Sequence, residues 1–178
     1  MGNLTHLAAQ NAALLRQGAS LIEGLDDGHF AGPGSEGPGG GVGSQLRHVL
    51  DYYGCFLRDV GAGRVDYDRR ERDPRLEQER VRAITRMLDW ATAMERVGDA
   101  YHDGPLDVRM ESANAPAGAD SWSRSSLGRE LHFLASHTVH HFALVSVMLR
   151  ARGVIVPTEI GVAPSTLEHW NRQGRCAR

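Results

Sequence analysis

Hydrophobic residues recur at steps of three and four in four stretches of the chain, and polar residues fill the positions between them. This spacing places the apolar side chains on one face of an α-helix, so each stretch predicts an amphipathic helix. The predicted helices cover residues 4–25, 44–60, 74–97 and 127–151. No stretch shows a convincing sheet pattern. The chain is therefore expected to be an all-α protein, a four-helix bundle.

Residues that suit helix ends stand beside these helices. A Ser or Asp side chain can accept a hydrogen bond from a free N–H of the first turn, and proline fits the first helical position. Glycine is common just after the last turn. The expected starts are Ser44, Asp73-Pro74 and Ser125 or Ser126, and Gly61 and Gly153 follow the second and fourth helices.

The connections between the helices are long. Residues 28–43 contain too many glycines and prolines to sustain a helix or strand. Residues 104–124 hold hydrophobic residues on both sides of an Asn-Ala-Pro-Ala-Gly turn, which predicts a short β-hairpin between the third and fourth helices. Residues 154–178 carry two prolines and are expected to fold over one end of the bundle. With no internal repeat, residues 1–178 are expected to form a single domain.

The charge balance is nearly even, with 20 Lys and Arg against 22 Asp and Glu. No basic stripe with interleaved aromatic residues appears, so no nucleic-acid partner is expected. No apolar run approaches the roughly 20 residues of a membrane span, and the first residues lack the order of a signal peptide. A cytoplasmic protein without a membrane partner is the expectation. Cys55 and Cys176 can form a disulfide, but two free thiols are the simpler interpretation in a domain of this size.

The histidines are the unusual feature, because four of the nine lie within residues 132–141. At about 100° per residue, His141 lies roughly 40° and His137 roughly 80° from Leu127, at the centre of the apolar stripe. His132 and His140 lie roughly 140° from it, on the far side of the helix. Histidines at i and i+4 can aim their ring nitrogens at one point, so the spacing selects His137 and His141 as a candidate metal pair.

A third ligand would have to come from another helix. His48 is the only histidine in the middle of one, but it lies roughly 140° from its own helix's apolar stripe, which suits an outer groove open to solvent. The zinc-protease motif is absent, because Thr138 stands where that motif needs Glu. On spacing alone, a structural bundle with incidental histidines is the better interpretation.

Two segments of the sequence favour a metal site over incidental histidines. The sequence Ser44-Gln-Leu-Arg-His48-Val-Leu-Asp51 on the second predicted helix, with His137-Thr-Val-His-His141 on the fourth, resembles the DinB/YfiT-like metal-binding superfamily. The segments 65–69 and 161–166 are also similar to DinB-like proteins. The resemblance implies a four-helix bundle with one divalent metal ion held by His48, His137 and His141. It implies zinc as the first choice of metal, with nickel or iron as alternatives. Tyr52, one turn after His48, occupies a position where a further histidine would also fit the resemblance.

The resemblance also implies a function class. Related proteins include thiol-dependent transferases and isomerases, so a metal-dependent thiol S-transferase, acting on a low-molecular-weight thiol and a small electrophile, is one hypothesis. No general acid or base can be assigned. The alternatives are a non-catalytic, stress-related metal-binding protein and a structural bundle with incidental histidines. A homodimer through exposed apolar residues of the first or fourth helix is a further expectation.

Two charged groups have open roles at this stage. The connection before the third helix carries Arg69, Arg70 and Arg72, which can bind an anionic substrate but are expected to pair with the acidic residues of the same segment. Arg129-Glu130 is expected to be either an exposed helix pair or a group that supports the histidines.

Overall fold

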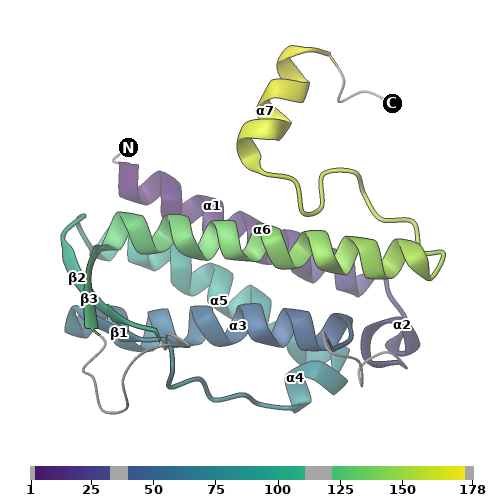
Figure 1. The fold of residues 1–178 in the computed structure, drawn as a ribbon, viewed down its shortest axis with the longest axis horizontal. Coiled ribbons are helices and arrows are strands. Elements are labelled where there is room, and N and C mark those ends of the chain that lie inside the picture. The colour runs from purple at the N-terminus through teal and green to yellow at the C-terminus, as the bar shows by residue number, and fades with distance from the viewer. Residues whose placement is uncertain (1–2, 33–39, 111–121, 175–178) are drawn as a thin grey trace.

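Four long helices form the body of the molecule (Figure 1). The computed structural model describes residues 3–32, 40–110 and 122–174. The long helices are α1 (Asn3–Glu23), α3 (Val42–Asp59), α5 (Arg80–Ala100) and α6 (Leu127–Ala151). Each of α1 and α3 packs against both α5 and α6. The predicted all-α four-helix bundle is therefore confirmed.

Much of the core consists of residues that the three- and four-residue spacing selects, and Phe30, Val65 and Tyr67 from outside the long helices help to complete it. Their side chains are almost completely shielded from water, and burial of apolar surface is the main stabilising contribution to such a fold. The largest of them include Leu15, Phe56, Met87, Leu131 and Phe142.

The third predicted helix is interrupted. It consists of α4 (Arg75–Gln78) and α5, with Glu79 in an extended conformation between them. Leu76 on α4 is buried and Arg47 of α3 pairs with Glu77, so the short helix docks on α3. A straight helix through Glu79 could not satisfy both this contact and the packing of α5 against α1. The prediction of one continuous helix over 74–97 was wrong for this reason.

Two further expectations about helix ends differ from the structure. The helix α3 begins at Val42 after Gly41, which carries no side-chain cap, so Ser44 is not the N-cap. The first residues of the expected 28–43 connection belong to a short helix, α2 (Asp27–Ala31), capped by Asp26. Residues 33–39 of this connection lie outside the described residues. At α6 the cap is confirmed, because the Ser126 side chain accepts a hydrogen bond from the Arg129 N–H.

A small sheet lies at one end of the bundle (Figure 1). Strands β2 (Pro105–Arg109) and β3 (Trp122–Ser126) pair antiparallel, so the predicted hairpin is confirmed, although its 114–118 turn lies outside the described residues. A third strand, β1 (Arg64–Asp66), follows the short 3₁₀ helix η1 (Val60–Ala62) and pairs parallel to β2. Three residues are too few to show a period in sequence, which explains why β1 was not predicted.

The tail folds back along α6 and not over an end of the bundle. Val156 and Ile160 are buried, and Arg150 donates to the carbonyls of Val156 and Pro157. Gly161 has a positive φ of 76°, and a Cβ there would lie 2.3 Å from the Ala143 nitrogen, so only glycine fits this contact. The final helix, α7 (Pro164–Arg172), has no buried residue and projects from the bundle (Figure 1). None of the helices in the described ranges has the length and apolarity needed to cross a membrane.

Candidate metal centre

Three histidines from two helices converge on one point. His48 comes from α3, and His137 and His141 come from α6. One ring nitrogen from each lies within 4.8 Å of the corresponding nitrogens of the other two. The ring centroids are 4.5 to 5.0 Å apart. The structure thus brings together the three residues that the sequence nominated.

The rings of His137 and His141 already have the spacing of two metal ligands. Their Nε2 atoms are 3.1 Å apart. Two nitrogens at about 2.0–2.1 Å from a tetrahedral zinc ion would be about 3.3 Å apart. The helix itself sets this spacing, because residues at i and i+4 lie one turn apart on the same face.

The amide of Gln45 fixes the orientation of one ring. Its Oε1 atom lies 2.6 Å from Nδ1 of His141. A carbonyl oxygen can only accept, so Nδ1 carries the proton and donates it. The Nε2 atom of His141 then keeps its lone pair and faces the other two rings. This is the arrangement in which metal-binding histidines usually occur. Gln45 was not singled out in the sequence.

A buried polar chain holds the helices in register beneath the histidines. The Tyr53 hydroxyl of α3 donates to Oδ1 of Asn11 on α1, at 2.7 Å, and lies 3.1 Å from the Thr138 hydroxyl of α6. The Asn11 amide donates to the Leu131 carbonyl at 3.0 Å. These three buried side chains therefore link α1, α3 and α6, and they limit sliding of α3 along α6, where His48 meets its partners.

Aromatic rings form one wall of the cluster. The Tyr52 ring centroid lies 5.0 Å from that of His48 and 4.4 Å from that of His137. Phe133, one turn before His137, stacks on that histidine with its centroid 5.6 Å away. Tyr52, at the position where the resemblance allowed a further histidine, thus packs against two of the candidate ligands.

All three rings stay neutral near pH 7. Burial, together with the positive charges of Arg70 and Arg47, lowers the pKa of His48 to about 4. Burial and then the neighbouring rings of His141 and His48 lower the pKa of His137 to about 3. Burial, with His48 and His140, lowers the pKa of His141 to about 4. Neutral imidazoles offer a lone pair to a cation without first losing a proton.

Sequence comparison agrees with this geometry. The DinB family matches residues 1–166 of the chain. The chain belongs to the DinB family. The expected family is thereby confirmed, and the cluster of three histidines together with this membership fits a metal-binding DinB protein.

One curated relative of this DinB protein is a Rhizopus delemar protein named FK506-binding protein 5. The two are 32% identical over 109 residues, which is 61% of this chain but only 28% of the relative. The similarity therefore covers under a third of that longer protein. No solved structure matches the chain.

The remaining histidines of the same helix stay outside the cluster of the DinB protein, as expected. His132 and His140 are exposed. The ring of His140 touches that of His141, with centroids 5.2 Å apart, but it contributes no nitrogen to the convergent group. Spacing around the helix was sufficient to separate the two kinds of histidine.

Glu130 supports the aromatic wall from behind. Its side chain is 1% exposed and accepts hydrogen bonds from the Tyr67 hydroxyl at 2.9 Å and from Ser125. The Tyr67 ring in turn packs on Tyr52 and Phe133. The exposed-pair interpretation of Arg129-Glu130 was therefore wrong for Glu130. The sequence contained a signal, because Glu130 lies roughly 60° from Leu127, on the buried side of the helix.

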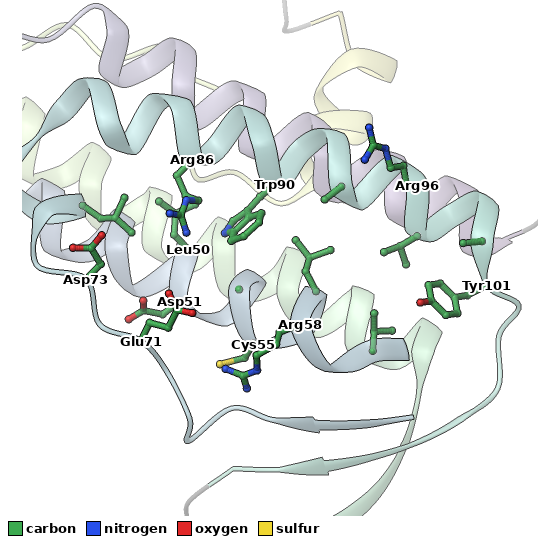
Figure 2. Close-up of a pocket in the computed structure, with 17 residues that line it drawn as sticks. Leu50, Asp51, Cys55, Arg58, Glu71, Asp73, Arg86, Trp90, Arg96 and Tyr101 are labelled. Carbon is green, nitrogen blue, oxygen red and sulfur yellow. The ribbon is translucent and has the colours of Figure 1, made fainter. Parts of the chain in front are cut away.

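A separate cavity lies between α3 and α5 (Figure 2). It has a volume of about 490 Å³ and none of the three histidines lines it. Figure 2 shows Trp90 and Arg86 entering it from α5, and Cys55 and Arg58 lying on α3. Cys55 is a free, buried thiol whose pKa is raised by burial. Since burial keeps this thiol protonated, Cys55 is a poor metal ligand.

Proposed function

We propose that this DinB protein binds one divalent metal ion through ring nitrogens of His48, His137 and His141. The observation that carries the proposal is the convergence of three neutral imidazoles from two helices, with ligand atoms within 4.8 Å of one another. Zinc is our first assignment, because imidazole nitrogens at tetrahedral spacing suit it, and nickel and iron are the alternatives.

We further propose that the metal is catalytic. Among the described residues, the convergent group contains three side chains and no fourth His, Cys, Asp or Glu. Structural zinc sites are usually closed by four protein ligands, whereas catalytic sites keep a position for water or substrate. The half-buried state of the three histidines leaves that position accessible to small molecules.

The chemistry we infer is thiol transfer to a small electrophile. The bound cation supplies positive charge that stabilises a thiolate near neutral pH. The thiol proton passes to solvent, the sulfur forms a bond to the electrophilic carbon, and the leaving group departs with the electron pair of the broken bond. The chain's own part is to orient and shield: Gln45 holds the His141 tautomer, and Tyr52 and Phe133 exclude water from one side.

Metal analysis tests the proposed metal binding, and a thiol assay tests the proposed catalysis. Mass spectrometry of protein purified without a His tag should find about one metal ion per chain. The loaded protein should accelerate thiol-dependent release of chloride from 1-chloro-2,4-dinitrobenzene, and the metal-free protein should not. A loaded protein inactive with a panel of thiols and electrophiles would favour the non-catalytic alternative. A protein that retains no metal would contradict both.

A further inference from the structure

Arg70 lies beside the histidine cluster, in the connection between β1 and α4. Its guanidinium carbon is 5.2 Å from the centroid of the Tyr52 ring. Its Nη1 atom donates to the Tyr52 hydroxyl at 3.0 Å. The same ring also contacts His48 and His137, at 5.0 and 4.4 Å between centroids. One tyrosine therefore borders both the candidate ligands and this arginine.

No salt bridge joins Arg70 to a carboxylate among the described residues, although its charge also acts on Asp51. Nearby arginines do have one: Arg47 pairs with Asp51, Arg58 with Asp59 and Arg75 with Asp73. The expectation that this connection pairs its own arginines was wrong for Arg69, Arg70 and Arg72, because Asp68 pairs with Arg109 and Asp73 with Arg75.

The side chain also contains an unsatisfied buried donor. The Nε atom of Arg70 is shielded from solvent and has no hydrogen-bond partner. A buried donor without a partner costs free energy, and more so when the group is charged. Such a group is stabilised when a ligand or an ordered water supplies the missing acceptor.

Arg70 approaches the candidate ligands through Tyr52, because that ring contacts the guanidinium and also the rings of His48 and His137. An anion between Arg70 and the cluster would be attracted both by the guanidinium and by a bound cation.

We propose that Arg70 is the anion-binding residue of this site, and that the ligand carries a carboxylate a few bonds from the atom directed at the histidines. This proposal rests on the proposed metal site. A guanidinium presents parallel N–H donors that match the two oxygens of a carboxylate. The Tyr52 hydroxyl accepts from Arg70 and so keeps its own proton to donate to the same group. The site thereby selects anionic over neutral ligands.

A matched pair of thiols tests this selectivity on the Co²⁺-loaded protein. The pair is 3-mercaptopropionate and its amide, 3-mercaptopropionamide, which have nearly the same shape but differ in charge. Visible absorption of the cobalt ion reports binding of each. We expect the carboxylate to bind about tenfold more tightly than the amide, the effect of one hydrogen bond to a charged group. Equal affinities in the wild-type protein would overturn the proposal.

Variants assign the preference to Arg70. In Arg70→Met the ratio of the two affinities should fall to about one. Arg70→Lys should keep part of the carboxylate preference, because lysine retains the positive charge but lacks the parallel N–H donors of a guanidinium. Arg69→Met, a change to an exposed neighbour, should leave the ratio unchanged. Helical circular dichroism verifies that each variant folds. A carboxylate preference that survives in folded Arg70→Met would contradict the assignment.

A measurement on the metal-free protein separates failure of this proposal from failure of the metal site. The Nε–H resonance of Arg70 in ¹⁵N-labelled protein, assigned by its loss in Arg70→Met, should shift with 3-mercaptopropionate and not with the amide. If the protein retains no Co²⁺ but this shift occurs, the metal site is refuted and the anion site stands. If Co²⁺ is retained and the resonance does not respond, the anion site is refuted.

Discussion

The Nδ1 atom of His141 donates its proton to Oε1 of Gln45, one residue on each of the two helices that form the candidate metal centre. This bond leaves Nε2 of His141 facing Nε2 of His137 at 3.1 Å. One amide, three residues before His48 on α3, thus determines which nitrogen of a histidine on α6 is available to a cation.

Replacing that amide should weaken the site without removing a ligand. In Gln45→Leu the size of the side chain is kept and the acceptor is lost, so the His141 ring is free to turn and to change tautomer. We expect zinc affinity to fall about 10- to 100-fold. Competition with a chromophoric chelator measures this. Unchanged affinity would show that the Gln45 contact does not orient the ligand.

Two histidines of the same helix provide a matched test of the ligand set. His137→Ala should lose bound metal, because two imidazoles do not hold zinc firmly. His140 is exposed and lies three residues after His137, so His140→Ala should keep about one metal ion per chain. Both should keep most of their helical circular dichroism. Equal metal content in the two variants would refute the role of His137.

The stability of the metal-free protein should depend on pH through the cluster. In the folded state the pKa values of His48, His137 and His141 are lowered to about 4, 3 and 4. In the unfolded chain a histidine titrates near pH 6.5, so below that pH the unfolded state binds more protons. The free energy of unfolding should therefore fall as the pH drops from about 6.5 to about 4.

Urea unfolding at a series of pH values measures this slope. His141→Gln removes one titrating ring and should flatten the curve, whereas the exposed His140→Gln should leave it close to that of the wild-type protein. A slope that is the same in His141→Gln as in the wild-type protein would mean that this ring is not held neutral in the folded state.

Two helical glycines should respond to alanine with opposite signs. A Cβ at Gly98 of α5 would lie 2.9 Å from Ala8 Cβ and 3.1 Å from Thr5 Cα, so Gly98→Ala should push α1 away and cost about 1–3 kcal/mol. A Cβ at Gly54 of α3 would meet only Trp90, at 3.8 Å. Gly54→Ala should therefore stabilise by about 0.5–1 kcal/mol, the usual gain within a helix. Thermal unfolding of both variants decides this, and the same sign in both would contradict the packing described.

The sequence alone determined whatever depends on local helix geometry. The period of 3.6 residues predicted the four long helices, and the same period placed His137 and His141 together and His132 and His140 apart. These relations hold within a single helix, where the hydrogen-bonded backbone fixes the rotation and the rise per residue. The hairpin of β2 and β3 was predictable for a similar reason, since its strands are close neighbours along the chain.

The tertiary structure decided whatever depends on two distant segments meeting. His48 lies away from its helix's apolar stripe, and it reaches the other two rings because α3 packs against α6 on one side and against β1 on another. The Gln45–His141 bond spans 96 residues and the pairing of β1 with β2 joins segments on either side of α5. The break at Glu79 depends on the docking of α4 on α3. No local pattern encodes these contacts, because they arise only when the burial of all the apolar faces selects one arrangement of the helices.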